Sequence, residues 1–311
     1  MAFHEGIWLL AAWPGMGSVA VSAATHLVQY LEGEVIEELP TQEWFPVRSV
    51  DVRQGMIQES KPPRLLLLRC QAPEANGLLV CIGESQPENH GHALCHTVIK
   101  RALAHGARHC ATCAAMAGPV DPRADPVVHI AATDARQLES ARRAGGQALL
   151  DGQIGGLNGV ILATAEQAGM DGICLLGDMP FFATGIPNPK ASLACLQVFT
   201  RMSGIAVDLE PLRQQAESVE SSLLELLERL RERNQEVLEE NFSDETDEAV
   251  EDLETSEELT VDPQLKRRIE GLFLAAEYDR RKAFELKEVL DQNDIFGLYE
   301  DRFLDLFRRT E

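Results

Sequence analysis

Two glycines flank a methionine where the first apolar run of the chain ends, a pattern typical of a strand that turns into a helix. Ile7 to Trp13 is apolar throughout, Pro14 cannot extend a sheet, and Gly15, Met16 and Gly17 follow. Backbone N–H groups at such a turn can hold an anion or a carbonyl group. The turn lacks the third glycine of a dinucleotide fingerprint and the Gly-Lys-Ser/Thr of a phosphate loop, so plain strand-to-helix geometry is the alternative to nucleotide binding.

Further candidate ligand-binding residues follow other apolar runs. Glu84 comes directly after the run that ends at Gly83, and Gly155 and Gly156 precede Asn158 in a glycine-rich stretch. We expect Asn158 to cap a helix over Gly159–Ala168, as we expect Ser18 to cap the first helix. Because open α/β sheets bind ligands at the carboxyl ends of their strands, these residues are expected at one edge.

A lysine stands in the first turn of a helix expected over Pro187–Ser203, together with Asn188. A cation at that end opposes the helix dipole. We therefore expect Lys190 to pair with Glu84 or Asp178, or to hold an anion beside Gly15 to Gly17. A merely solvated lysine is the alternative.

Histidines and cysteines gather between residues 90 and 113. His92 and His96 have the one-turn spacing of metal ligands. However, Cys110 and Cys113 stand in an apolar context, with no second Cys-x-x-Cys pair, so helix-face histidines and core thiols are favoured over a metal or redox site. Nothing in the spacing of Ser, His and Asp marks a catalytic triad, and we assign no catalytic residue, metal or cofactor.

The elements that must position these residues alternate between apolar runs and amphipathic segments, which predicts an α/β domain with a mixed sheet. A hairpin-like central pair is expected from Arg64–Cys70 and Leu78–Gly83. The other predicted strands are Ile7–Trp13, Val35–Leu39, Trp44–Val52, Ala107–Met116, Pro126–Ala132 and Gly172–Gly177, and helices are predicted over 18–33, from about 84 to 105, and over Ala135–Ala144, which Asp134 should cap.

The net charge of −22 is unevenly distributed. Up to Leu209 the chain has 14 basic and 20 acidic residues, and from Glu210 onward it has 14 and 30. This balance argues against a nucleic-acid partner. The seven cysteines, an odd number set in apolar runs, indicate reduced core thiols. No segment is long enough to span a membrane and the first residues do not resemble a signal peptide, so we expect a cytoplasmic protein without membrane contact.

The acidic C-terminal part is expected to form a helical appendage. Residues 1–209 form the predicted α/β domain, 210–240 an amphipathic helix with a heptad seam, 241–262 an acidic linker and 263–311 further helices. Glu239 to Asp262 contains twelve acidic residues and no basic one, which predicts a disordered or loosely held segment. The helices can pack on each other or on the α/β domain, or they can bind another chain.

The sequence resembles the proteasome assembly chaperone two family over about residues 1 to 209. The resemblance is carried by WPGMGSVA at Trp13–Ala20, IGGLNGVILATAEQAGMDGICLLG at Ile154–Gly177 and PNPKASLACLQVFTRMSGIAVDL at Pro187–Leu209. It implies a three-layer phosphorylase/hydrolase-like α/β fold, assembly as trimers or tetramers and, in some members, chaperone work on proteasome subunits. Some members are labelled ATP-grasp proteins, but this sequence has no phosphate loop. Asn188 stands where the family commonly has Asp, which weakens a catalytic or metal role there.

Two function classes follow from these observations. The favoured one is a non-enzymatic, homo-oligomeric protein-binding or assembly-chaperone-like protein with a protein client. The alternative is an enzyme or small-molecule binder that acts on an anionic metabolite or nucleotide at the glycine-rich strand ends. A deep closed pocket lined by Lys190, Glu84 and Gly17 would favour the enzyme, and a shallow apolar groove would favour the binding protein.

Overall fold

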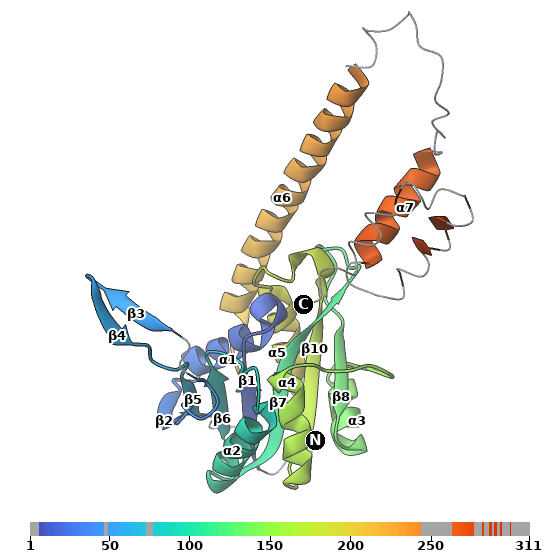
Figure 1. Ribbon diagram of the computed structural model, residues 1–311. Coiled ribbons are helices and arrows are strands. Elements are labelled where there is room, and N and C mark those ends of the chain that lie inside the picture. Colours follow the sequence, from blue (N-terminus) through green and yellow to red (C-terminus); the bar gives the residue numbers. More distant parts are fainter. Residues whose placement is uncertain are drawn as a thin grey trace, which may run out of the picture. The chain divides into compact units, whose positions relative to one another are not determined.

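The computed structural model describes residues 6–46, 49–72, 77–243 and 263–276, and seven residues beyond them: Lys282, Leu286, Lys287, Val289, Leu290, Asn293 and Tyr299. They form two compact units, residues 1–241 and 242–311. The first unit is an α/β domain built on an eight-stranded sheet, shown in Figure 1. No described helix has the length and apolarity needed to cross a membrane.

The sheet is mixed, as the sequence predicts. Its strand order is β2-β5-β6-β1-β7-β10-β8-β9. The four middle strands β6, β1, β7 and β10 are parallel, whereas β2, β5 and β8 pair antiparallel with a neighbour. The strands are β1 (Ile7–Ala12), β2 (Glu34–Leu39), β5 (Leu65–Cys70), β6 (Leu78–Gly83), β7 (Ala107–Gly118), β8 (Val128–Ala132), β9 (Gln147–Ala148) and β10 (Asp171–Pro180).

Helices cover both faces of this sheet, which gives three layers. The helices are α1 (Val19–Tyr30), α2 (Gly91–Ala104), α3 (Ala135–Arg143), α4 (Leu157–Gln167), α5 (Pro189–Ser203) and α6 (Glu210–Ser243), with short 3-10 helices η1 (Met16–Ser18) and η2 (Phe181–Ala183). Side chains of β1 alternate between two apolar cores. Trp8 and Leu10 pack with residues of α1, α5 and α6, while Leu9 and Trp13 pack with residues of α2 and α4.

Most predicted elements are found close to their expected bounds, but α2 begins at Gly91 and not near residue 84, and the following strand assignments also differ. β5 and β6 pair antiparallel as predicted, yet they lie toward one edge, and β1 and β7 occupy the centre. The predicted strand over Trp44–Val52 is wrong in its first half. Trp44 and Phe45 form a turn in which both N–H groups donate to the carbonyl of Thr41, and a strand begins only at Val50.

That strand belongs to a separate hairpin. β3 (Val50–Arg53) and β4 (Met56–Glu59) pair antiparallel in a two-stranded sheet of their own. Figure 1 shows the hairpin standing away from the main sheet.

The first half of α6 packs on the α/β domain. Leu212 and Leu223 are buried in the same core as α1 and α5, and Ala216 is also buried. The predicted helix that starts at Pro263 is α7 (Pro263–Ala276), and in the second unit it shares a small core with Leu286 and Leu290. The acidic segment 244–262 and nearly all of the predicted helix 295–309 lie outside the described residues.

Candidate functional site

The carboxyl ends of β6, β1, β7 and β10 meet at one edge of the sheet, because these strands are parallel neighbours. η1 follows β1 at this edge and η2 follows β10. Hydrogen bonds join Trp13 and Gln86 to the first residues of α4, and they join Gly17 of η1 to Thr184 and to Asn188, the N-cap of α5. Most of the candidate residues are therefore gathered here. Their hydrogen bonds decide whether the edge is open to a ligand.

Asn158 fixes the end of β1 and does not cap a helix. Helix α4 starts at Leu157 with Gly156 as its N-cap, so the predicted cap at Asn158 is wrong by two residues. The Asn158 side chain is buried and pairs with the peptide of Trp13. Trp13 N donates to Asn158 Oδ1 over 3.1 Å, and Asn158 Nδ2 donates to Trp13 O over 3.3 Å. Thr112 Oγ1 of β7 donates to the Asn158 carbonyl over 2.8 Å.

Gln86, which the sequence analysis did not single out, links the turn after β1 to the start of α4. Its Nε2 donates to the carbonyl of Pro14 over 2.6 Å, and its Oε1 accepts from Leu157 N over 2.8 Å. This amide therefore uses the first N–H of α4, which an anion would need. A Cβ at Gly156 would lie 2.8 Å from Gln86 Oε1, so the glycine makes room for this bond, whereas a Cβ at Gly155 would meet nothing within 4 Å.

The turn of Gly15, Met16 and Gly17 is bonded to the loop before α5. Gly17 N donates to Thr184 O over 2.9 Å, and Asn188 N donates to Gly17 O over 2.7 Å. Asn188 is the N-cap of α5, where its Oδ1 accepts from Ala191 N. Gly17 has φ +60°, and a Cβ there would lie 3.0 Å from Met179 Sδ. Glycine is favoured here because a side chain would strain the backbone and press against Met179.

Ser18 stands at the predicted N-cap position of α1, but its side chain does not cap the helix. Ser18 has a left-handed backbone with φ 50°, and its side chain makes no capping bond to α1. Its own N–H donates to Gly15 O within the turn. The left-handed conformation turns the chain sharply from η1 into α1, which the sequence pattern does not reveal.

Glu84 and Lys190 lie apart from this hydrogen-bonded cluster. Glu84 Oε2 accepts from Arg64 N over 2.7 Å, and it ties β6 to β5. Neither predicted partner of Lys190 is correct. Lys190 Nζ lies 2.6 Å from Glu220 Oε2 of α6 and donates to the carbonyls of Pro122 and Arg123.

The other carboxylate considered for Lys190, Asp178, faces a histidine instead. Its Oδ1 lies 3.0 Å from His129 Nε2. The dipole argument that Lys190 needs an anionic neighbour therefore holds, but the neighbour comes from the acidic helix and not from a strand end.

Lys190 lines a cavity of about 180 Å³ together with Glu220. The wall is mostly apolar, with Val120, Val127 and Leu223 among its side chains. Glu84 and Gly17 are absent from this wall. Lys190, Glu84 and Gly17, whose shared pocket would favour an enzyme, therefore do not line this cavity together.

The edge exposes several large apolar side chains. Met16 of η1 is 48% exposed, and Phe181 and Phe182 of η2 are 57% and 45% exposed. Ile186, at 37%, follows in the same loop. The bonds of Gly17 to Thr184 and Asn188 hold these two segments together. We call Met16, Phe181, Phe182 and Ile186 the edge patch. Two adjacent phenylalanines directly after an apolar strand were the available sequence signal for it.

The histidines and cysteines do not form a metal site in the part of the chain that the structure describes, since no three potential ligands cluster there. The rings of His92 and His96 pack against each other on α2, with centroids 4.5 Å apart. All seven cysteines are buried and free, which confirms the prediction of reduced core thiols. Burial raises the pKa of Cys70 to about 11 and the pKa values of Cys95 and Cys174 to about 12, so thiolate chemistry is disfavoured.

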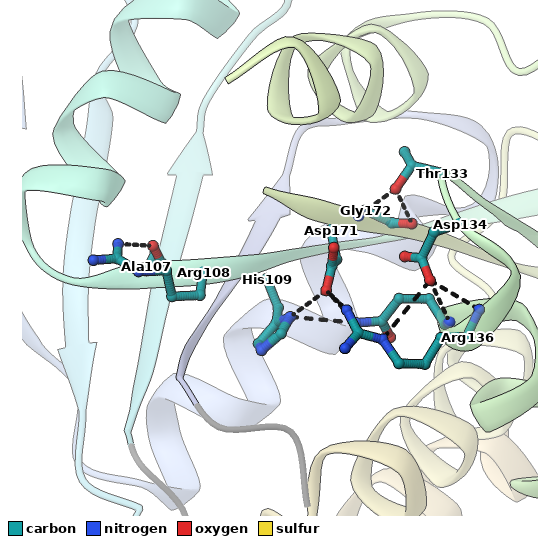
Figure 2. A network of polar contacts seen from close by, with 9 residues as sticks. Ala107, Arg108, His109, Thr133, Asp134, Arg136, Asp171 and Gly172 are labelled. Carbon is teal, nitrogen blue, oxygen red and sulfur yellow. Dashed lines mark hydrogen bonds and ion pairs between the residues drawn. The ribbon is translucent and has the colours of Figure 1, made fainter. Parts of the chain in front are cut away.

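A second polar cluster lies at the opposite edge, where β7 and β10 begin (Figure 2). His109 Nδ1 is 3.3 Å from Asp171 Oδ2, and Arg136 of α3 donates to the same oxygen over 2.9 Å. Asp134 caps α3, as the sequence predicts. The hydroxyl drawn in this cluster, Thr133 Oγ1, accepts from Gly172 N. These bonds attach α3 to the sheet, and they do not align a nucleophile with the histidine.

The comparison with family models agrees with the resemblance found in the sequence. The model of the PAC2 family matches residues 9–227, which is well over half of the chain. The chain belongs to the PAC2 family. An uncharacterized protein from Methanocaldococcus jannaschii is 28% identical over 223 residues, which cover 70% of this chain and 81% of that protein.

Solved structures support the fold. Pyrococcus furiosus PbaB, described as an archaeal proteasome activator, is similar with a TM-score of 0.58 and 23% identity over 73% of this chain and 95% of its own. A proteasome-assembly chaperone homologue from Mycobacterium tuberculosis has a TM-score of 0.61 and 21% identity over 70% and 94%. P. furiosus PbaA, a homolog of proteasome-assembly chaperone, has a TM-score of 0.57 and 21% identity over 78% and 96%. This PAC2 protein therefore shares its α/β fold with them.

Proposed function

We propose that this protein is a non-enzymatic, assembly-chaperone-like protein that binds a protein client through the edge patch. The observation that carries the proposal is the exposure of Met16, Phe181 and Phe182 at the edge where α/β folds place their ligands. Exposed aromatic and methionine side chains are typical of protein-binding surfaces.

The polar groups at the same edge support this function over the alternative. The backbone N–H groups of Trp13, Gly17 and Leu157, which could hold an anionic substrate, already donate to Asn158, Thr184 and Gln86. A metabolite would have to displace these bonds. An apolar client surface only has to cover the patch.

The client we propose is a proteasome subunit or the assembled proteasome core. The support is membership of the PAC2 family and the shared fold with proteins described as a proteasome activator and as chaperone homologues. A cytoplasmic location fits the seven free thiols. We also propose that the protein acts as a homo-oligomer, a trimer or another closed assembly.

Binding of the purified protein to the proteasome core, and to its separate subunits, from the same organism tests the client. Changing Phe181→Ser with Phe182→Ser should weaken binding by about tenfold or more, because central aromatic contacts dominate such interfaces. Tyr30→Ser is the matched control, since Tyr30 is an aromatic side chain 48% exposed at the end of α1, at the opposite edge of the sheet. Equal affinity of the double variant and the parent would contradict the role of the patch, and no binding by the parent would contradict the client.

A further inference from the structure

The β3–β4 hairpin lacks the packing that normally stabilises such an element. All eight residues of its two strands are exposed, and the strands pair only with each other. An isolated two-stranded hairpin is marginally stable at best in water. The hairpin therefore needs a surface to cover it.

One face of the hairpin carries three apolar side chains, with Glu59 beside Val50 at its root. Val52 pairs directly with Ile57, and Val50 lies two residues before Val52 on the same face. These side chains are 64%, 73% and 52% exposed. Met56, beside the turn, is 68% exposed. The half of the hairpin near its turn thus carries apolar side chains that the rest of the first unit does not cover.

A groove of about 520 Å³ lies at the root of the same hairpin. Ser49 and Ser60, the residues directly before β3 and directly after β4, are part of its wall. Its larger apolar side chains are those of Trp44, Phe45, Pro46, Pro62 and Pro63.

The groove cannot be filled by the hairpin to which it belongs. Each strand has four residues, so the turn lies roughly 14 Å from the root and leads away from the groove. The hairpin of a second copy, in contrast, can bring its tip into the groove.

Charge favours this occupant. Arg53 lies beside the turn, and it makes no ion pair with any residue that the structure describes. Glu43 in the groove likewise has no ion-pair partner within the described residues. The groove also contains Glu88 and Lys61, so carboxylates outnumber its one lysine. Arg53 at the tip can therefore pair with a carboxylate of the groove, although Asp51 and Glu59 give the two strands one more acidic than basic residue. Such a pair matters because copies with a net charge of −22 otherwise repel each other.

We propose that the tip of the β3–β4 hairpin of one copy binds in the root groove of a second copy, with Arg53 facing Glu43. Val52 and Ile57, which lie on the opposite face of the hairpin from Arg53, then pack against the aromatic and proline side chains of the groove. The contact joins two different surfaces, the hairpin tip of one copy and the groove of the other. Two copies can exchange hairpins to form a closed dimer, or several copies can form a ring. The proposal rests on the self-association proposed above and names the surface responsible.

Cross-linking between two single-cysteine variants tests the contact. The variants Arg53→Cys and Glu43→Cys are mixed under mild oxidation, and we expect a disulfide-linked dimer that contains one chain of each kind. The background is low because the seven native cysteines are buried. Arg229→Cys, a change of a 77% exposed arginine on α6, replaces Arg53→Cys in the matched control and should give no such dimer with Glu43→Cys.

Charge reversal followed by light scattering gives an independent readout. Arg53→Glu and Glu43→Arg should each lower the mass of the oligomer, and the double variant should restore it, while Arg229→Glu should leave it unchanged. A parent that is monomeric at micromolar concentration overturns both this contact and the proposed self-association. An oligomeric parent with no specific cross-link, or with single variants of unchanged mass, overturns only the hairpin contact. Reduced client binding without any change of mass would assign the hairpin to another protein and overturn it as well.

Discussion

The buried side-chain amide of Asn158 determines which backbone groups remain available to a ligand at the carboxyl edge of the sheet. It satisfies both the N–H and the carbonyl of Trp13 at a point where β1 has left the ladder. A buried backbone group without a partner is costly, so this position needs a side chain that donates and accepts. The same bonds remove the donors that an anionic ligand would require.

Replacing Asn158 by Ala should lower the free energy of unfolding by about 1–3 kcal/mol, because the peptide of Trp13 would be left buried and unpaired. Denaturant unfolding measures this change. Gln153→Ala is the matched control, since Gln153 is an exposed amide for which no hydrogen bond is seen. A variant with the stability of the parent would mean that water replaces both bonds.

Lys190 belongs to the interface between α5 and α6. Its ammonium group has three acceptors, two of them carbonyls of the β7–β8 loop, and the side chain is only 19% exposed. Lys190→Met should therefore lower the free energy of unfolding in plain buffer, by about 1–3 kcal/mol.

The stability of two further variants and the effect of added phosphate distinguish this ion pair from an anion site. Glu220→Gln should lower stability in the same direction, and Lys100→Met, a change of an exposed lysine on α2, should not. Added phosphate should stabilise neither the parent nor Lys190→Met. If phosphate stabilises the parent and the lysine variant loses that effect, Lys190 holds an anion after all.

At the scale of elements, α6 is part of the α/β domain for about its first four turns. Leu212 and Leu223 are 1% and 8% exposed, in the core that also contains Trp8 of β1. We propose that the folding unit extends beyond the predicted boundary at residue 209 and includes this part of the helix.

Two truncated chains test this boundary. A chain that ends at Asn241 keeps the whole first unit. A chain that ends at Leu209 should have a free energy of unfolding that is lower by at least about 2 kcal/mol, because it loses buried leucines. Thermal or denaturant unfolding of both compares them directly. Equal stability would show that α6 contributes nothing to the domain.

The sequence alone predicted the elements whose residue pattern clearly favours one kind of structure. The apolar runs of β1, β5, β6 and β10 are short and end at turn residues, which favours buried strands, and Asp134 directly before an amphipathic stretch predicts a cap that is present. The aromatic pair Trp44-Phe45 was misassigned because large apolar side chains favour strands in general. Here they partly pack on the core from a turn, which the N–H bonds to Thr41 determine.

The candidate site was predictable only in part, because its bonds join residues distant in the chain. Sequence analysis placed Gly17, Asn158 and Asn188 at one edge, and the structure brings these into one hydrogen-bonded region. It could not reveal that Gln86 joins Pro14 to Leu157, or which of thirty C-terminal carboxylates pairs with Lys190. Such choices depend on the packing of helices, which periodicity does not specify.

At the scale of the whole molecule, the buried thiols link folding to pH. An exposed thiol has a pKa of about 8.5. Burial raises the pKa of Cys70 to about 11 and those of Cys95 and Cys174 to about 12, and it also raises the pKa values of Cys81 and Cys110. For Cys113 a hydrogen bond with Cys195 raises the pKa first and burial adds to it. Each thiol therefore stays protonated in the folded chain when it is ionised in the unfolded chain.

The free energy of unfolding should consequently be constant with respect to these thiols below about pH 8 and fall as the pH rises above about 8.5, by up to about 1.4 kcal/mol per pH unit for each thiol. Denaturant unfolding between pH 7 and 9.5 measures the slope, below the range where tyrosine and lysine titrate. Cys174→Ala should give a shallower slope, because one buried thiol is lost. Thr164→Ala, which removes a fully buried hydroxyl that does not titrate, should shift the curve without changing its slope. A stability that stays level or rises between pH 8.5 and 9.5 would show that the thiols ionise in the folded protein as readily as in the unfolded chain.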